Sequence, residues 1–541
     1  MFFVRDINFK SYLIKTFLVF ATLLFSLFNS NNGFASTPLY GVFETSITNN
    51  NTYTNPFNYK EIELQTTFTS PSGRKVDFFG FYNGDGSGGQ VGNVWTMRFM
   101  PDETGTWKYT YTWSDGKAAG GSGEFTVIDT GLSGPVRIAS DNGSFLMDSR
   151  SKKLDFRGYD MHHFGPVIGN TSDDWSAISG DWISGLDTYV IKRGYNFVMM
   201  DSPSQLATSR NYWYKGQTDV FDIAVWVDYE KILSHALTND IYLFPFDGIV
   251  GQDEKGKLTD NLLRYIVARF SPYASYFGFS PTWEWSEIWT ANILNSHMNK
   301  IYNWIPFYKL LSAHDRSDKS SANWLGFSMR QKQSDTIFDG NCRACGQHGG
   351  VDASLINRPI IASEDLWENA GGAYQHPKNA GEVRQGTWGI LMAGILPLYS
   401  EWYNRDKSPG NMPGEPEYRK ALDFFYANTR YREYTMLNDL VSATDGQIAS
   451  GIPSVEYLVY DVDGGSISIS LSDVNSTARF STTWYNPITG EKTSGPTIQG
   501  GGIANLISPY SSESVLLVQF TKNEADSVAT QSPPNFNVTK P

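Results

Sequence analysis

The sequence has few cysteines, few charged residues and only one long apolar run. Its two cysteines, Cys342 and Cys345, stand in a single C-x-x-C segment. That spacing indicates redox or metal chemistry in a cytosolic protein, but in an exported chain it favours a short disulfide that holds a loop. A zinc site that includes His348 lacks an evident fourth ligand. The sequence therefore predicts neither a bound metal nor another cofactor.

Basic residues are too few for a nucleic-acid-binding groove. The chain has 43 Lys and Arg against 56 Asp and Glu, a net charge of -13, whereas such grooves need clustered positive charge. We therefore expect no nucleic-acid partner. Only 18% of the 541 residues are charged and 40% are apolar, so a large core can be buried. The length suits a barrel of about 250 residues together with smaller modules.

The single long apolar run, residues 17–28, reads as part of a signal peptide. It follows the basic residues Arg5, Lys10 and Lys15, and it precedes the small residues Gly33 and Ala35. This order predicts cleavage after Ala35 and a secreted or periplasmic protein. No later stretch is long and apolar enough to span a bilayer. The expected cleavage point lacks a cysteine, so we predict no lipid or membrane anchor.

Aromatic residues are abundant, with 16 Trp, 30 Tyr and 34 Phe making up 15% of the chain. Flat rings stack on the apolar faces of pyranose sugars, as they do on other planar partners. Aromatic residues are also enriched in the cores of β-sheets. Both interpretations stay open for the tryptophans as a set.

The pattern along the chain changes twice. Residues 37–130 hold short alternating runs separated by Gly-rich turns, which is typical of a β-sandwich. Residues 136–430 alternate apolar strand-like runs with amphipathic stretches such as 182–193 and 225–238, and eight such units predict a (β/α)8 TIM barrel. Residues 431–521 return to strands and predict a second β-sandwich, followed by a disordered polar tail at 522–541.

Acidic residues recur where the predicted barrel strands end. Reactive groups of TIM barrels lie at this C-terminal face. Cleavage of a glycosidic bond needs one carboxyl group to protonate the leaving oxygen and a second to attack carbon or to activate water. The set therefore points to glycoside hydrolysis. Its members are Asp160, Asp201, Asp247, Glu284, Glu287, Glu364 and Glu401.

Three segments resemble the cellulase-type clan (clan A) of retaining glycosidases. Segment 156–163 (FRGYDMHH) looks like its first-strand signature, 281–289 (PTWEWSEIW) like the fourth-strand segment with the acid/base, and 358–365 (RPIIASED) like the seventh-strand segment with the nucleophile. Residues 136–405 are more closely similar to the apiosidase-like branch, in segments 264–270 and 382–394 and in His314. The regions before and after resemble the N-terminal module and the C-terminal sandwich often fused to these barrels.

The resemblance implies a role for each of two glutamates. Glu364 corresponds to the nucleophile, with Glu401 as the substitute candidate. Glu287 corresponds to the acid/base, although Ser286 stands where the family carries Asn, and Glu284 is its rival. Retaining double displacement then follows, and it predicts carboxyl groups about 5 Å apart, against roughly 6.5–9.5 Å for inversion.

The remaining predicted site residues contact the sugar. Arg157, His162, His163 and His314 are expected to donate hydrogen bonds, and Trp402 resembles the ring on which the clan rests the sugar at the cleavage point. The adjacent histidines also suggest a metal, but neighbours on a strand point to opposite faces and share one ion poorly. The other expected contacts are Asp201, Glu284, Trp285, Arg330, Trp367 and Glu401.

Two other classes of function remain open at this stage. A polysaccharide lyase acting on uronic acids would use His163 as base and Arg330 to neutralise the sugar carboxylate. A non-catalytic glycan-binding protein would combine the two sandwiches with an inactive barrel, but glutamates at both expected strand ends speak against it. The leading interpretation is a secreted glycoside hydrolase acting on a plant or algal polysaccharide or its oligosaccharides.

Overall fold

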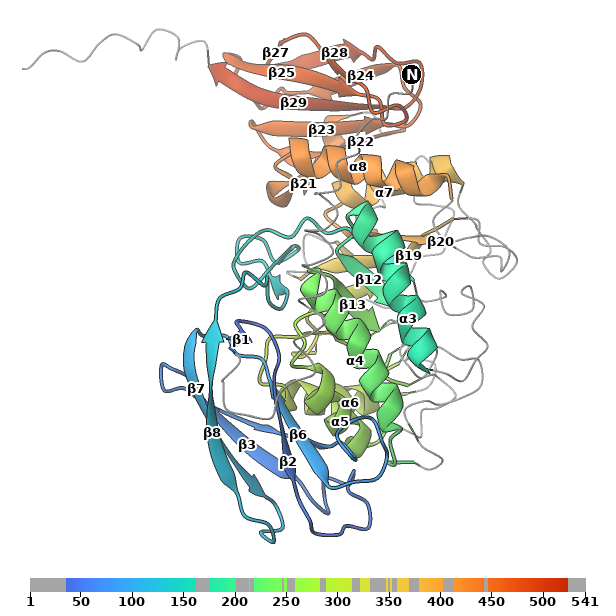
Figure 1. Cartoon of the computed structure of the whole chain (residues 1–541). Coiled ribbons are helices and arrows are strands. Elements are labelled where there is room, and N and C mark those ends of the chain that lie inside the picture. Colours follow the sequence, from blue (N-terminus) through green and yellow to red (C-terminus); the bar gives the residue numbers. More distant parts are fainter. Residues whose placement is uncertain are drawn as a thin grey trace, which may run out of the picture.

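Sheets and helices succeed one another in three regions of the chain (Figure 1). A computed structural model describes residues 36–161, 175–200, 214, 218–245, 248–250, 258–282, 289–313, 322–330, 347–348, 351–352, 358–368, 379–401, 412–441 and 446–523. The predicted signal peptide, the Cys342–Cys345 pair and most of the predicted tail lie outside these ranges. No helix within them is long and apolar enough to cross a membrane.

The N-terminal region consists of two sheets that pack face to face. One has the order β1-β8-β7-β3-β4 and the other β2-β6-β5. Phe68 of β3 stacks on Phe99 of β6 with ring centroids 4.1 Å apart, and Phe43 of β2 stacks on Phe125 of β8 at 3.7 Å. The strands are β1 (Thr37–Pro38), β2 (Phe43–Thr48), β3 (Leu64–Thr69), β4 (Lys75–Phe79), β5 (Phe81–Tyr82), β6 (Val94–Phe99), β7 (Gly105–Trp113) and β8 (Gly121–Ile128).

The middle region contains eight parallel strands linked in a ring. Six of them pair in the order β13-β12-β11-β20-β19-β16, and β14 pairs with β15. Parallel bridges join Leu243 to Tyr276 and Leu311 to Leu325, which connect β14 and β15 to the two ends of the six-stranded sheet. The strands are β11 (Gly158–Asp160), β12 (Phe197–Met200), β13 (Tyr242–Pro245), β14 (Gly278–Phe279), β15 (Leu310–Leu311), β16 (Ser328–Arg330), β19 (Ile360–Glu368) and β20 (Leu396–Glu401).

Helices connect these strands, and polar residues fix where several of them begin. The side chains of Thr259 and Thr290 accept backbone N–H bonds at the starts of α5 and α6, and Asn379 forms a reciprocal capping box with Glu382 at the start of α7. Such caps satisfy donors that have no partner inside the helix. The helices are α3 (Trp175–Gly185), α4 (Ile223–Thr238), α5 (Asp260–Phe270), α6 (Ala291–Trp304), α7 (Ala380–Met392) and α8 (Gly414–Asn428); a π-helical turn (Leu186–Val190) and a 3-10 turn (Ile191–Arg193) extend α3.

Phenylalanine rings fill the interior of the ring. Phe197 lies 4.9 Å from Phe156 and 4.9 Å from Phe277, while Phe327 lies 5.2 Å from Phe244 and 5.3 Å from Phe277. All five side chains are 3% exposed or less. The ring is therefore a packed core and not a pore, as is usual for a TIM barrel.

The C-terminal region is a seven-stranded sheet with a second, two-stranded one. It packs on α7 and α8, where Phe424 stacks on Tyr485 at 4.1 Å and Arg384 bonds Glu513 at 2.6 and 2.8 Å. The strands are β21 (Thr435–Met436), β22 (Gln447–Ile452), β23 (Glu456–Asp461), β24 (Ser466–Ser470), β25 (Ala478–Tyr485), β26 (Lys492–Ser494), β27 (Ile498–Gln499), β28 (Ile503–Ile507) and β29 (Ser514–Asn523), with short 3-10 turns at Tyr431–Glu433 and Asn438–Leu440. Two small antiparallel pairs complete the described strands, β9 (Arg137–Ile138) with β10 (Leu146–Met147) and β17 (Gln347–His348) with β18 (Val351–Asp352).

The N-terminal sheets are fastened to the ring through a buried ionic cluster. Glu230 of α4 accepts hydrogen bonds from Arg98 of β6 at 2.5 and 2.7 Å and from Arg269 of α5 at 2.5 and 3.0 Å. Burial alone would raise the pKa of Glu230, but the two guanidinium groups override it and hold the pKa at about 2. The carboxylate therefore stays charged and joins the two regions.

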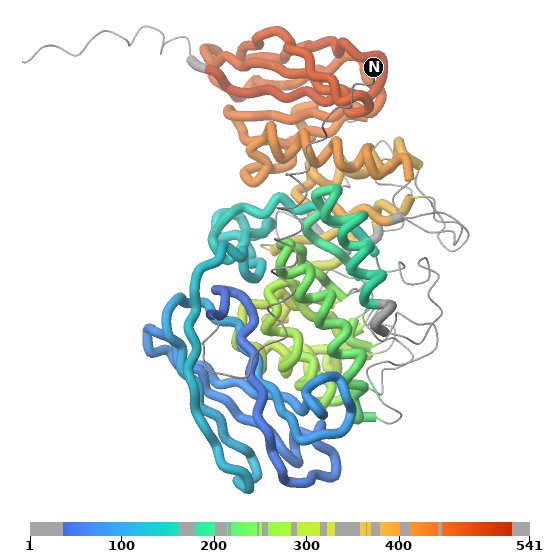
Figure 2. The backbone as a smooth tube through the Cα atoms, viewed as in Figure 1, coloured from blue at the N-terminus to red at the C-terminus, as the bar shows by residue number. Residues whose placement is uncertain are grey.

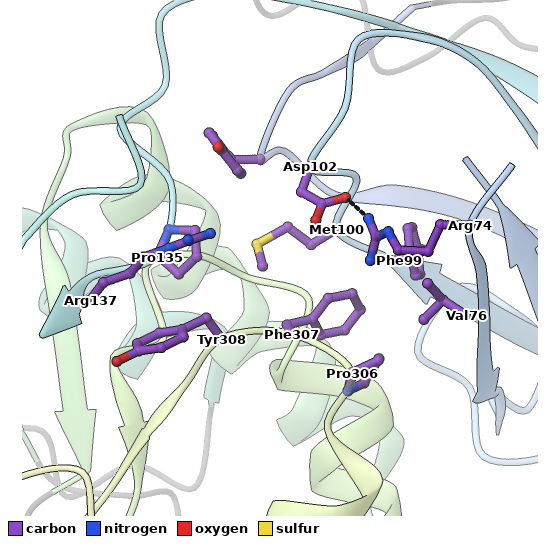
Figure 3. Close-up of a pocket in the computed structure, with 11 residues that line it drawn as sticks. Arg74, Val76, Phe99, Met100, Asp102, Pro135, Arg137, Pro306, Phe307 and Tyr308 are labelled. Carbon is purple, nitrogen blue, oxygen red and sulfur yellow. Dashed lines mark hydrogen bonds and ion pairs between the residues drawn. The ribbon is translucent and has the colours of Figure 1, made fainter. Parts of the chain in front are cut away.

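The N-terminal sheets contact the ring a second time just before β15, at the N-terminal ends of the ring strands (Figure 3). Phe307 packs edge-on against Phe99 at 5.2 Å and against Phe78 at 5.4 Å. In the same close-up Arg74 forms an ion pair with Asp102, and Arg137 lies over the ring of Tyr308. The Arg74–Asp102 pair lies within the N-terminal sheets, so the aromatic contacts of Phe307 hold these sheets against the ring here.

The sequence places one strand too early. It predicts a strand over 390–399, but residues 390–392 are the end of α7, and β20 starts only at Leu396. Both segments are apolar and buried, so periodicity does not separate them. Gly394, at φ +72°, lies in the left-handed region and turns the chain between the two.

Candidate active site

The parallel strands of the ring all end on the same side, so their last residues form one face. On the described part of this face lie Asp160 of β11, Arg330 of β16, Glu368 of β19 and Glu401 of β20. Strands of a parallel sheet present their carboxyl ends together, and enzymes built on such rings place their reactive groups there. The candidate active site is therefore this end of the ring.

A buried hydrogen bond joins two neighbouring strands at this face. Ser400 donates from its Oγ to Oδ2 of Asp160 at 2.9 Å. Asp160 is 3% exposed and Ser400 is fully buried. A buried carboxylate needs such donors, because its charge is otherwise costly away from water.

The register of the strands shows that this pair points into the ring. Asp160, Ser400 and Trp367 are register partners on β11, β20 and β19, so their side chains share one face. Their neighbours Tyr159 and Tyr399 point the other way, where they meet Tyr195 and Tyr418 between strands and helices. Asp160, Ser400 and Trp367 therefore form an inner layer on the side of the strand ends.

Glu364 lies in an irregular part of β19. Ala362 pairs with Pro397, and the next pair is Leu366 with Tyr399, so three residues of β19 stand opposite the single residue Leu398. A bulge of this kind bends a strand and redirects its side chains, and bulges are frequent beside active sites. Ser363 and Asp365, on either side of Glu364, are buried at 0% and 2% exposure.

The segment that carries Glu284 and Glu287 is held at its start by a close backbone contact. Gly248 follows β13 at φ +81°, and a Cβ there would lie 2.3 Å from the backbone of Thr282. The next residue, Ile249, donates its N–H to the carbonyl groups of Ser280 and Pro281 at 3.0 and 3.1 Å. Only glycine fits this contact, which fixes the backbone at Thr282, two residues before Glu284 in the sequence.

Glu368 is a buried carboxyl group with a structural partner. It accepts the N–H of Gly414 at 2.9 and 3.0 Å and the hydroxyl of Tyr399 at 2.6 Å. Burial raises the pKa of Glu368, and these hydrogen bonds oppose the rise. A carboxylate at the first residues of α8 is favoured by the helix dipole, so we assign Glu368 to holding α8 on the ring.

Only part of the predicted site falls within the described residues. Arg330 and Glu401 are the last residues of β16 and β20, and Glu364 lies within β19. Only the backbones of these three residues are described. His348, named above for a zinc site, has its backbone in β17. Trp367 is 3% exposed in the inner layer. Outside the described residues lie His162, His163, Asp201, Asp247, Glu284, Trp285, Glu287, His314 and Trp402.

The prediction that Arg157 contacts the sugar is not supported by its position. Arg157 precedes β11, at the end of the ring opposite to the candidate site. Its guanidinium forms an ion pair with Asp423 of α8 at 2.7 Å and lies over the ring of Tyr426. The resemblance implied that Arg157 contacts the sugar, but its side chain points outward, toward α8. We therefore leave it out of the candidate site.

Sequence reasoning gave Ser400 no role and gave Asp160 only a place among the strand-end acids. The signal for Ser400 is its position directly before Glu401 at the end of an apolar run, but a serine there has many structural explanations. Within the described ranges, no group of three or more His, Cys, Asp or Glu side chains is arranged to hold a metal ion.

Comparisons with known proteins add to this geometry. Residues 36–114 match a family described as a domain of unknown function, DUF5060. No curated protein matches the chain. A candidate glycoside hydrolase of Bacteroides vulgatus ATCC 8482 has a similar structure, with a TM-score of 0.69 and 18% identity over 90% of this chain and 100% of that one. A glycoside hydrolase of family 5 from the same organism gives a TM-score of 0.54 and 14% identity over 72% of this chain and 94% of that one. The chain therefore has a TIM-barrel fold of the kind found in these glycoside hydrolases.

Proposed function

We propose that the chain is a glycoside hydrolase that cleaves glycosidic bonds in a plant or algal polysaccharide or in its oligosaccharides. The observation that carries the proposal is the position of Glu364, in a bulge of β19 beside the inner layer of Asp160 and Ser400. TIM-barrel enzymes carry their reactive groups at this end of the strands. The shared fold with two glycoside hydrolases supports the same reaction class.

The proposed mechanism is a double displacement with retention. The carboxylate of Glu364 attacks the anomeric carbon while Glu287 protonates the departing glycosidic oxygen, so that one C–O bond forms as the other breaks. Glu287 then removes a proton from water, whose oxygen attacks the same carbon and releases Glu364. Glu284 is the alternative acid/base. The two reacting groups and water suffice, so no cofactor is proposed.

We further propose that the ring is a complete (β/α)8 barrel within residues 136–430, flanked by β-sandwiches at 37–130 and 431–521. The N-terminal sheets packed face to face, and the sheets that cover α7 and α8, support this division. Residues 1–35 are proposed as a cleaved signal peptide, which would place the mature enzyme in the periplasm or outside the cell.

The function is tested with a panel of soluble polysaccharides, measuring the reducing ends released and identifying the products by chromatography. Glu364→Gln and Glu287→Gln should each lower turnover by a factor of roughly 10^2 to 10^4, with Glu284→Gln as the comparison for the acid/base. Glu124→Gln, on the exposed side of β8, is the control. Proton NMR of the first product should show the substrate's own anomer. Full turnover by Glu364→Gln contradicts the assignment, and absence of reducing ends from every polymer contradicts the function.

A further inference from the structure

The N-terminal sheets carry a cavity of about 480 Å³ that the proposed reaction does not use. It lies between the loop at residues 49–57 and the loop at residues 90–93, and Val220, just before α4, completes its wall. Its polar lining consists of amides and hydroxyl groups, among them Asn50, Thr52 and Asn93. None of the residues described around it is Asp, Glu, Lys, Arg or His. The volume lies in the range of small-molecule binding pockets.

The amides of the cavity are held in fixed orientations. Asn93 donates from Nδ2 to Oδ1 of Asn50 at 2.6 Å, and Asn51 donates to Oδ1 of Asn49 at 2.9 Å. Asn49 in turn donates to the hydroxyl of Tyr53 at 3.0 Å, which donates to Asp115. Asn50 accepts through its oxygen, so its NH2 group is not used in this pair and remains available as a donor to a ligand. Preorganised donors lose little entropy when a ligand binds.

The cavity stands beside the face of the ring where the strands end. Asn55 donates to the carbonyl of Asp219 at 2.9 Å, and Gln90 donates to the carbonyl of Phe221 at 2.7 Å. Both acceptors immediately precede α4, which follows β12 along the chain, so they belong to the end of the ring that holds the candidate active site. Figure 2 shows the blue loop of the N-terminal sheets against the end of the green helix there.

The lining fits an uncharged sugar chain. Each sugar hydroxyl both donates and accepts, and so does each amide, so neighbouring Asn side chains can pair with successive hydroxyl groups. The Val91 side chain, 85% exposed at the mouth, offers an apolar contact for the C–H face of a ring. A carboxylated or sulfated sugar would meet no cation among these residues, whereas burial of an unpaired charge is costly.

We propose that this cavity binds a neutral stretch of the polysaccharide, at a distance from the bond that is cleaved. The inference rests on the proposed function, because it takes the polysaccharide bound in the cavity to be the polymer that the candidate active site hydrolyses. The cavity extends the contact with a long polymer and leaves short fragments unaffected. It also assigns a glycan-binding role to residues 49–57 and 90–93 of the N-terminal region.

The proposal is tested by native gel electrophoresis of the full chain in gels containing xyloglucan, galactomannan or laminarin as neutral polymers, and alginate or polygalacturonate as acidic ones. The double variant Asn50→Ala/Asn93→Ala removes the paired amides. Val91→Asp places a charge at the exposed mouth without touching the core. The matched control is Ser468→Ala/Asn505→Ala, which removes an exposed side-chain pair of similar geometry, 2.7 Å, from the C-terminal region.

We expect at least one neutral polymer to retard the unmodified protein and the control equally, with affinity about tenfold weaker in the Asn50/Asn93 variant and in Val91→Asp. On that polymer kcat/KM should fall in both variants, and on short oligosaccharides it should stay unchanged. Equal retardation of all four proteins, retardation by acidic polymers alone, or no retardation at all would overturn the proposal. Loss of hydrolysis is scored separately by reducing ends, so a protein that binds through this cavity but cuts nothing contradicts the proposed function and not the binding site.

Discussion

Ser400 of β20 donates a 2.9 Å hydrogen bond to Oδ2 of Asp160 on β11, and both side chains are buried inside the ring of parallel strands. This bond joins β20 to β11 near the irregular part of β19 that contains Glu364. It therefore links the stability of the ring to the geometry of the candidate site.

Replacing Ser400 by Ala should destabilise the protein by about 1–3 kcal/mol, because the buried Asp160 carboxylate loses a donor. Urea unfolding followed by tryptophan fluorescence measures the free energy of unfolding. Ser468→Ala, on the exposed side of β24, should leave it unchanged. Turnover should fall about tenfold in Ser400→Ala, in line with roughly 1.4 kcal/mol of lost transition-state stabilisation. Equal stability of the two variants would contradict the structural role of the bond.

Replacing Gly248 by Ala should displace the segment that carries Glu284 and Glu287. The added Cβ would lie 2.3 Å from the backbone of Thr282, and the residue would be held at φ +81°. We expect kcat to fall about tenfold or more, since misplacement of a catalytic group by about 1 Å costs on the order of 10^2-fold. Steady-state kinetics on the polymer identified by the panel provides the measurement.

Gly180→Ala is the control for Gly248→Ala, because nothing lies within 4 Å of a Cβ at this position in α3. That change should leave kcat unchanged and should slightly stabilise the helix. Unaltered kcat in Gly248→Ala would show that the backbone contact does not position the segment.

Replacing Glu230 by Gln should destabilise the protein by about 3–5 kcal/mol, because the guanidinium groups of Arg98 and Arg269 would be left buried without their counter-charge. Glu44→Gln alters a partner of Arg98 whose side chain is 44% exposed, and it should cost less than about 1 kcal/mol. Thermal unfolding of both variants at one pH compares them. A similar melting temperature for the two would mean that burial does not matter at this cluster.

Stability should rise with pH above neutrality because of Lys309. Its ammonium group donates to the carbonyls of Tyr273 and Tyr276 just before β14, and burial lowers its pKa to about 7. Between pH 7 and about 10.5 the unfolded chain binds a proton there that the folded chain has released, so the free energy of unfolding rises by up to about 1.4 kcal/mol per pH unit. Below pH 7 both states are protonated and the dependence disappears.

The variant Lys309→Met removes this titration, so its stability should change less than that of the unmodified protein between pH 7 and pH 9. Lys300→Met, with a side chain 36% exposed on α6, is the control and should keep the original pH dependence. Urea unfolding at pH 6, 7, 8 and 9 gives the four free energies for each protein. Parallel curves for Lys309→Met and the unmodified protein would contradict the role of Lys309.

Much of the order of helices and strands was predictable from sequence, because periodicity distinguishes amphipathic helices from buried parallel strands. It failed at residues 390–392, where the helix itself is buried. The helix expected over 225–238 is observed at Ile223–Thr238, and eight parallel strands of the expected barrel are observed in a linked ring. Strands β2, β8, β22 and β23 were not anticipated. The exposed positions of β2 and β8 include Ser46, Thr48, Ser122 and Thr126, which are residue types also frequent in turns. Strands β22 and β23 are almost wholly buried, so they lack the alternation of a half-exposed strand, and pairing with distant strands decides the outcome.

The sequence indicated which strands carry acidic residues at their ends. It did not indicate which side chains those residues contact. An acid at the end of an apolar run, such as Glu401, is the last residue of its strand, whereas Glu364 falls within β19. The bulge that surrounds it depends on the length mismatch between β19 and β20, which no local pattern encodes. Arg157 illustrates the same limit, since one strand position decides whether its side chain meets Asp423 or the interior.

The five phenylalanine rings that fill the interior determine how substrate and water can enter the ring and how products can leave it. They close the ring below the layer of Asp160, so nothing passes from one end of it to the other. For a hydrolase working at the strand ends, substrate, attacking water and both products share a single opening. A polymer must then lie across that face and cannot thread through the protein, and each product competes with the next substrate for the same exit.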